Sequence, residues 1–195
     1  MENMRRFFLA YPRPVSRSFS TEPVWQALYD VAASQEGFFA TRQAAAGYSA
    51  PLLAHHRKVG RITRIRRGVY RLVHFPAGEH EDLVVAWLWA EAAAVISHQT
   101  ALSLHGLSDS LPVRIHLTLP LDWRRRRLRV PKGLVLHYAD VQDKERTWVG
   151  PMPVTSIRRT LDDALRDLDQ VTRWQAGIRG LPGSLRLHVR LLVFD

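Results

Sequence analysis

The sequence predicts an α+β fold, and three observations support this class. Between residues 21 and 60, apolar residues recur at helical spacing, bounded by capping residues and glycines. The spacing then changes to the alternation typical of strands in "RITRIRRGVYRL", and residues 82–195 mix helical with alternating segments. A hydrophobic content of 46% with six tryptophans gives the 195-residue chain enough material for a packed core.

Three helices and a hairpin are expected before residue 75. The helices span about 21–37, 42–46 and 50–59, and each begins at a capping residue and ends at a glycine. The caps are Thr21, Thr41 and Ser49, and the glycines are Gly37, Gly47 and Gly60. In the third helix, Leu52, Leu53 and Val59 are expected to face the core. Two short strands follow, joined at Arg67-Gly68, so the order predicts a winged helix-turn-helix over residues 21–74.

The predicted domain organisation has four parts. Residues 1–20 form a flexible basic tail, residues 21–74 the winged helix-turn-helix, and residues 75–81, rich in Pro, Gly and acids, a linker. Residues 82–195 form a mixed α+β domain. Helices are expected in "DLVVAWLWAEAA", in "VISHQTALSLHG" from a cap at Ser97, and from Thr155 or Ser156 onward, with strands in "RIHLTLP" and "LVLHYAD". One more helix and an apolar tail are expected at the C-terminus.

The charge of the chain indicates a polyanionic partner. The formal net charge is +10, and residues 41–72 contain eight Arg and Lys residues but no Asp or Glu. Such a cluster repels itself unless a negative partner lies against it, and nucleic acid is the first candidate, an anionic membrane surface the second. The absence of cysteine excludes disulfides and thiolate zinc sites. No apolar run is long enough for a membrane span, and prolines interrupt the N-terminus, so we expect no signal peptide and a cytoplasmic location.

The predicted DNA contacts come from the third helix, the wing and the start of the second helix. In a helix-turn-helix the second of the paired helices enters the major groove, and its exposed residues meet base edges. Arginines of a wing reach phosphates or a narrow minor groove. The predicted set is Arg42, Ser49, His55, His56, Arg57, Lys58, Arg64, Arg66 and Arg67. The alternative is that these side chains form only a solvated charged face.

Several phrases resemble a known family. "GFFATRQAAAGYSAPLLAHHRKVGRITRIRRGVYRL" is similar to the N-terminal winged-helix domain of AbiEi-type antitoxins of bacterial type IV toxin–antitoxin and abortive-infection (phage defence) loci. "VISHQTALSLHGLSDSLPVRIHLTLP" and "VTSIRRTLDDAL" resemble that family's C-terminal domain. The resemblance implies an antitoxin that represses its own operon by binding operator inverted repeats and counteracts a nucleotidyltransferase toxin. It implies no individual toxin contacts.

Two alternatives stay open beside the antitoxin: a stand-alone winged-helix regulator whose second domain senses a ligand or dimerises, and a relic of a nucleic-acid-processing enzyme. We expect no catalysis, no cofactor and no metal. His98 and His105 share a helix face, but no carboxylate falls on it at a matching interval. Asp167–Asp169 superficially resembles a D-x-D metal motif but lacks the preceding Gly-Ser. The basic run Arg124–Lys132 is interpreted as a second nucleic-acid contact, a docking surface for an acidic partner, or a solvated loop.

Overall fold

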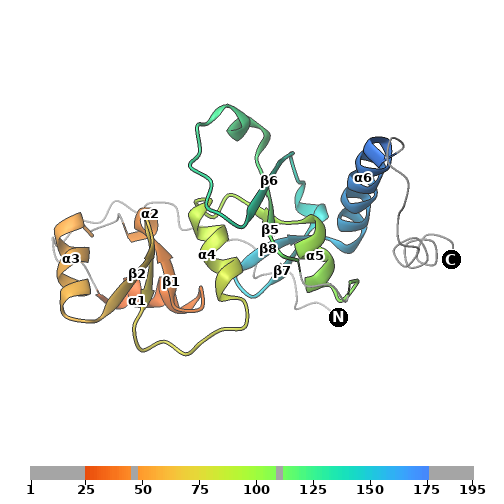
Figure 1. The fold of residues 1–195 in the computed structure, drawn as a ribbon. Coiled ribbons are helices and arrows are strands. Elements are labelled where there is room, and N and C mark those ends of the chain that lie inside the picture. Colours follow the sequence, from red (N-terminus) through yellow and green to blue (C-terminus); the bar gives the residue numbers. More distant parts are fainter. Residues whose placement is uncertain (1–24, 45–47, 109–111, 176–195) are drawn as a thin grey trace.

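The computed structural model describes residues 25–44, 48–108 and 112–175, and shows an α+β fold with two sheets (Figure 1). The first part of the chain contains α1 (Trp25–Ala33), β1 (Phe38–Ala40), α2 (Thr41–Ala44), α3 (Ala50–Lys58), β2 (Ile62–Arg66) and β3 (Val69–Leu72). The second part contains α4 (Glu81–Trp89), β4 (Val95–Ile96), α5 (His98–Leu104), β5 (Ile115–Leu119), β6 (Leu134–Tyr138), β7 (Arg146–Val149), β8 (Met152–Thr155) and α6 (Ile157–Gln175). Two 3-10 helices, η1 (Leu121–Arg125) and η2 (Asp143–Glu145), lie in its loops.

The N-terminal region has the three helices and the hairpin of the predicted winged helix. β2 and β3 pair antiparallel, and the turn between them places Gly68 at a φ of 80°, which glycine adopts without steric cost. β1 adds a third strand, in the order β1-β3-β2. This strand was not expected, because three residues between two helices are too few to show an alternating pattern. The predicted cap at Thr21 and the end of the second helix at residues 45–47 lie outside the described residues.

The core of the N-terminal region forms where α1 and α3 cover the three-stranded sheet. Phe39 of β1 is fully buried in a cluster that includes Leu28 of α1 and Leu53 of α3. Neighbouring strand residues face opposite sides of a sheet, so Phe38 and Ala40 point to the other face. There they join the larger cluster around α4.

The C-terminal region contains a mixed five-stranded sheet in the order β6-β5-β4-β8-β7. The central pair β4–β8 and the pair β5–β6 are parallel, while β4–β5 and β7–β8 are antiparallel. β5 and β6 confirm the two predicted strands, and α6 begins directly after Ser156 as predicted. β4, β7 and β8 were not expected, since β4 has only two residues and a proline lies inside β8.

Helix α4 connects the two halves of the molecule. The residues from Val84 to Leu88 are all buried, so the helix is covered on every side. It contacts β1 and β3 of the first sheet and β4, β5 and β8 of the second, and it lies between the two sheets in Figure 1. The predicted linker at residues 75–81 stays a prediction. The apolar cluster around α4 contains residues from before this segment as well as from after it.

Two further sequence expectations concern the ends of the chain and its environment. The last predicted helix and the apolar tail lie in residues 176–195, outside the described part of the chain. Among the described residues, no helix has the length and apolar character that crossing a membrane requires.

Candidate nucleic-acid interface and a histidine cluster

Helix α3 presents one face to the core and another to solvent. Ser49 occupies the N-cap position with extended backbone angles, though its side chain makes no capping hydrogen bond, and Pro51 lies in the first turn. Leu53 and His56 are buried, whereas the side chains between and after them are exposed. The exposed, predicted contact residues of this helix region are Ser49, His55, Arg57 and Lys58.

His56 is a core residue, which corrects its prediction as a DNA contact. Its ring stacks on Trp25 of α1, with centroids 4.8 Å apart, and lies 5.7 Å from the ring of Tyr48. Burial lowers the pKa of His56, and the nearby charge of Arg61 lowers it further, so the ring is neutral at neutral pH. Its Nδ1 is buried and has no hydrogen-bond partner among the described residues.

His56 was assigned to the exposed side of α3 because the core-facing residues of this helix were predicted incorrectly. Val59 was expected to complete the inward face, but it follows the last turn and its side chain is half exposed, at 51%. The inward face instead continues from Leu53 to His56, three residues later. The signal that could have found this was Trp25, an aromatic partner on the neighbouring helix.

The wing carries the second group of predicted contacts. Arg64 and Arg66 lie on β2, and Arg67 lies in the turn; all three side chains are exposed. The irregular pairing between Arg64 and Arg66 allows Arg64 Nε to donate to the carbonyl oxygen of Arg66 at 3.3 Å. The backbone N–H and the hydroxyl of Thr41 both donate to the carbonyl oxygen of Gly68, which fixes the wing against the start of α2.

Arg42 is exposed but has a carboxylate partner. Its guanidinium pairs with Glu91, which also lies 3.7 Å from the guanidinium of Arg126. An exposed ion pair of this kind contributes at most about 1 kcal/mol, so a phosphate can compete for Arg42. Arg42 therefore contributes less free positive charge than the sequence predicted.

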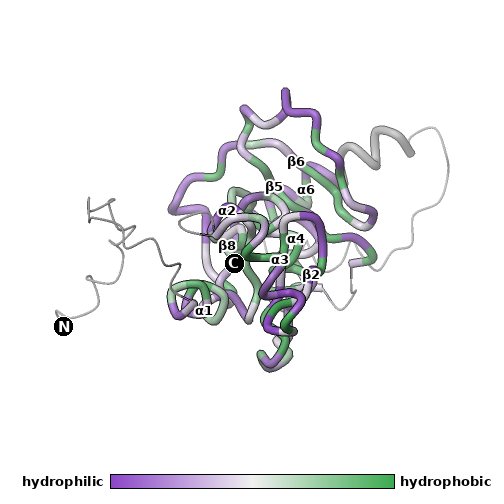
Figure 2. Tube along the Cα trace, turned by 90° about the vertical axis from the view of Figure 1, so that its left-hand side faces the viewer, coloured by the Kyte–Doolittle hydropathy of each residue, from purple (hydrophilic) through white to green (hydrophobic). Residues whose placement is uncertain are grey.

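Five predicted cations remain without an acidic partner among the described residues: Arg57, Lys58, Arg64, Arg66 and Arg67. We call these five side chains the basic face. α3 and β2 are packed together at the end of the molecule farthest from α6 (Figure 1). Figure 2 looks onto this end, where hydrophilic segments of α3 and β2 face the viewer. Unpaired cations on a helix and an adjoining hairpin are suited to contact the phosphates of a duplex.

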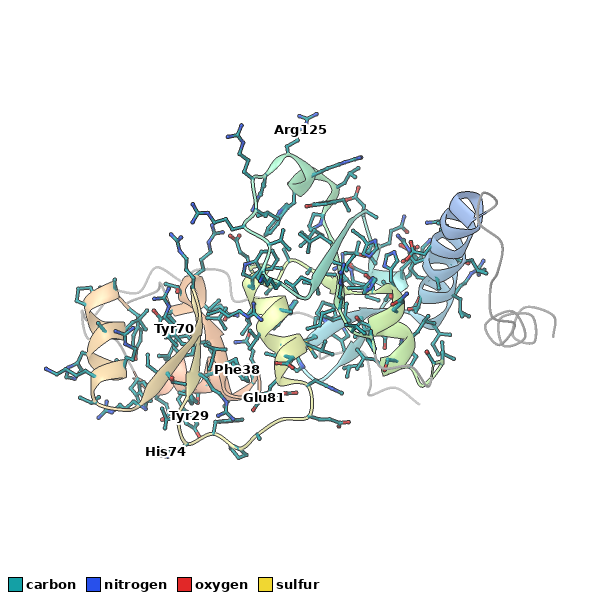
Figure 3. All side chains as sticks on the ribbon, in the orientation of Figure 1. Tyr29, Phe38, Tyr70, His74, Glu81 and Arg125 are labelled. Carbon is teal, nitrogen blue, oxygen red and sulfur yellow. The ribbon has the colours of Figure 1, made fainter. Side chains whose placement is uncertain are left out.

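The second basic run begins in η1 and continues in the loop before β6. Its Arg and Lys side chains are exposed, and Arg125 projects away from the body of the protein in Figure 3. The guanidinium of Arg126 lies over the ring of Trp123, 3.9 Å from its centroid. Through Glu91, which Arg42 and Arg126 share, the run lies beside α2.

A cluster of three histidines lies in the C-terminal region. His98 at the start of α5 stacks on His137 of β6, with ring centroids 3.5 Å apart, and His116 of β5 lies 5.2 Å from His137. His116 Nδ1 and His137 Nε2 are 3.1 Å apart. Burial lowers the pKa of all three imidazoles, that of His137 to about 4, so they are neutral at neutral pH.

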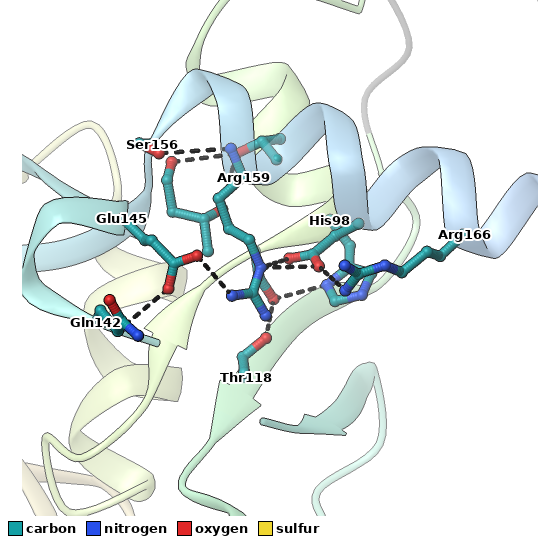
Figure 4. Close-up of polar contacts among 11 residues, drawn as sticks. His98, Thr118, Gln142, Glu145, Ser156, Arg159 and Arg166 are labelled. Carbon is teal, nitrogen blue, oxygen red and sulfur yellow. Dashed lines mark hydrogen bonds and ion pairs between the residues drawn. The ribbon is translucent and has the colours of Figure 1, made fainter. Parts of the chain in front are cut away.

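Helix α6 brings acidic residues to this cluster. Asp163 is buried, and its two carboxylate oxygens share the single N–H of Arg159 Nε, at 2.9 and 3.0 Å from the nitrogen; another nitrogen of Arg159 donates to Glu145 (Figure 4). Asp167, one turn later, lies close enough to His98 and His137 for the three ligand atoms to fall within 4.8 Å of one another. The prediction concerned only the helix face that His98 and His105 share; the fold supplies a carboxylate to His98 from a different helix.

His105, the other histidine of the predicted pair, has a separate role. Its Nε2 lies 2.7 Å from the carbonyl oxygen of Thr155, which connects the end of α5 to the end of β8. His98 is instead held by Ser97, whose hydroxyl oxygen lies 2.9 Å from His98 Nδ1 and accepts a hydrogen bond from Thr118 at 2.8 Å. His98 also has a φ of 53°, a left-handed conformation that costs a residue with a side chain about 1–3 kcal/mol.

Comparison with known proteins identifies the N-terminal region. Residues 26–73 match the model of a family described as a transcriptional regulator, the AbiEi antitoxin. The match extends from α1 to the end of β3, so it contains the basic face. It confirms the family resemblance for this region, and a transcriptional regulator acts on DNA. No curated protein matches the chain.

Proposed function

We propose that this protein binds duplex DNA through the basic face and represses transcription of its own operon. The observation that carries this proposal is the set of five exposed cations without acidic partners among the described residues, on the region that matches a transcriptional regulator. A polyanion removes the repulsion among these cations, and the release of its counterions drives the association.

The two parts of the basic face have different roles in this proposal. Arg57, on the exposed side of α3, contacts base edges and pairs with guanine through O6 and N7. Arg66 and Arg67, at the wing tip, contact phosphates or a narrow minor groove and set the register of the domain on the duplex. His55 and Lys58 flank Arg57 on the same exposed side.

We further propose that residues 82–195 act as an antitoxin without catalysing a reaction. The support is the resemblance of "SHQTALSLHGLSD" and "VTSIRRTLDDAL" to the C-terminal domain of AbiEi-type antitoxins, together with the family matched by the N-terminal region. The partner in this proposal is a nucleotidyltransferase toxin encoded beside this gene.

The DNA-binding part is tested by gel shifts with the duplex upstream of the protein's own reading frame. We expect a shift that weakens as salt rises and that is lost or strongly reduced when Arg66 and Arg67 are both replaced by alanine. The matched control is Arg158→Ala, which removes an exposed arginine from α6. No shift with the wild-type protein at low salt would contradict the proposal.

The antitoxin part is tested by co-expression with the product of the neighbouring reading frame, scored as bacterial growth. The full chain carrying Arg66→Ala and Arg67→Ala should still rescue growth if neutralisation does not depend on DNA binding. Absence of a nucleotidyltransferase frame beside the gene, or failure of the wild-type chain to rescue growth, would contradict the antitoxin role.

A stand-alone regulator with a ligand-sensing second domain is the second candidate. The observation that favours it is an open pocket of about 410 Å³ between β6 and α6, lined by His98, His137, Arg159 and Asp167 among others. Ligand sensing predicts that a small molecule or ion changes DNA affinity in the absence of any toxin. The antitoxin function does not require such a change.

A further inference from the structure

We propose that His98, His137 and Asp167 form a binding site for a divalent transition-metal ion of the zinc type. The three residues come from the start of α5, from β6 and from α6, and their ligand atoms lie within 4.8 Å of one another. Two imidazoles and one carboxylate are a donor set that zinc accepts, with a fourth position left for water or another ligand.

The hydrogen bonds of both histidines leave one ring nitrogen of each available. His98 Nδ1 lies 2.9 Å from the hydroxyl oxygen of Ser97, so donation of its proton there leaves the lone pair on Nε2. His137 Nε2 lies 3.1 Å from His116 Nδ1, and donation in that direction leaves the lone pair on His137 Nδ1. Metal-binding histidines in proteins are usually oriented in this way by a second hydrogen bond.

Asp167, unlike Asp163, has no arginine paired with its carboxylate among the described residues. Asp163 accepts the N–H of Arg159 Nε on both of its carboxylate oxygens and is approached by Arg166, whose guanidinium lies 3.6 Å away. Asp167 lies one turn further along α6, on the same helix face, and has no hydrogen bond or ion pair with the described residues. Its partly exposed carboxylate faces the two imidazoles, whose pocket opens to solvent.

Ion binding requires a limited rearrangement of the rings. The planes of His98 and His137 are within 13° of parallel, so an ion in the plane of one ring lies outside the plane of the other. Zinc binds nitrogen at about 2.0–2.1 Å, which places the ligand atoms of a tetrahedral ion about 3.3 Å apart. Rotation of the half-buried His137 ring brings the donors together, and the open pocket that this ring lines leaves space for it.

The experiment is a titration of the untagged full chain with Co²⁺, followed by its visible d–d absorption, and then with Zn²⁺ in competition. We expect each chain to bind one Co²⁺ ion and to show the visible absorption of Co²⁺ with nitrogen ligands. We expect added Zn²⁺ to displace the Co²⁺. His137→Gln and Asp167→Asn should each lower the affinity at least about tenfold. Asp162→Asn, an exposed acid on another side of α6, should leave it unchanged.

Metal-free thermal melts of each variant serve as the folding control, so a loss of binding in a folded Asp167→Asn protein supports the site. Failure of the wild-type chain to bind an equivalent of Co²⁺ or Zn²⁺ would overturn the proposal. Binding that persists unchanged in both His137→Gln and Asp167→Asn would also overturn it, since the ion would then sit on other histidines. The result does not depend on DNA binding or on toxin neutralisation.

Discussion

Removal of the wing-tip arginines should reduce the salt dependence of DNA binding by a calculable amount. The perturbation is Arg66→Ala together with Arg67→Ala, two exposed side chains without acidic partners among the described residues. Each phosphate contact contributes about −0.9 to the slope of log K against log salt concentration. Arg57 is assigned to base edges, so the four other side chains of the basic face contact phosphates and give a slope of about −3.6, and the two that remain in the double variant give about −1.8.

The difference in slope is large enough to measure. Between about 50 and 200 mM salt, the wild-type affinity should fall about 150-fold and that of the double variant about 12-fold. The assay is fluorescence anisotropy of a labelled duplex over a salt series, with Arg158→Ala as a control that keeps the wild-type slope. A double variant with the wild-type slope, or a wild-type slope near zero, would refute the assignment of these arginines to phosphates.

Three further predictions concern the reading helix, the N-terminal core and the α6 cluster. Arg57→Ala should weaken the free energy of binding to the preferred DNA sequence by about 1–3 kcal/mol and relax base preference, whereas Arg66→Ala should weaken binding to all sequences alike. Competition binding to a randomised duplex library measures both effects. The second prediction concerns His56, whose pKa is lowered in the folded protein. As pH drops below about 6.5, His56 takes up a proton in the unfolded chain but stays neutral in the folded one, so the free energy of unfolding should fall. In the His56→Phe variant, urea titrations should show that this part of the pH dependence of unfolding has disappeared, while DNA affinity stays within about twofold. An unchanged pH dependence, or a large loss of DNA affinity, would contradict the assignment of His56 to the core. Arg159→Met leaves the buried carboxylate of Asp163 without its main partner and should lower the free energy of unfolding by about 3 kcal/mol, while a loss below about 1 kcal/mol in urea unfolding would argue against that pair.

The sequence predicted the elements of the N-terminal region better than the direction of individual side chains. Apolar spacing located α1 and α3, and the switch from helical to alternating spacing located the hairpin, because these signals are local. His56 was assigned to the DNA because it was placed opposite the expected core residues Leu52, Leu53 and Val59, but its stacking on Trp25 is a contact between two helices. Helical spacing alone did not show which face met that partner.

In the C-terminal region, the strands and the site depended on pairing between distant segments. β4 and β8 are short, and they pair with each other in the centre of the sheet although they lie far apart along the chain. The carboxylate beside His98 comes from residue 167, on another element, so spacing along one helix could not reveal it. Local signals therefore predicted the fold class, while the cluster of His98, His137 and Asp167 needed the tertiary structure.

The most direct test of DNA binding by the basic face is site-specific photo-cross-linking. With p-benzoylphenylalanine in place of the exposed His55 on α3, we expect irradiation to attach the protein to a duplex from its own upstream region. The same group in place of Trp148, exposed on β7 in the C-terminal region, should give little product. Cross-linking from β7 but not from α3, in proteins that both shift the duplex, would contradict the account.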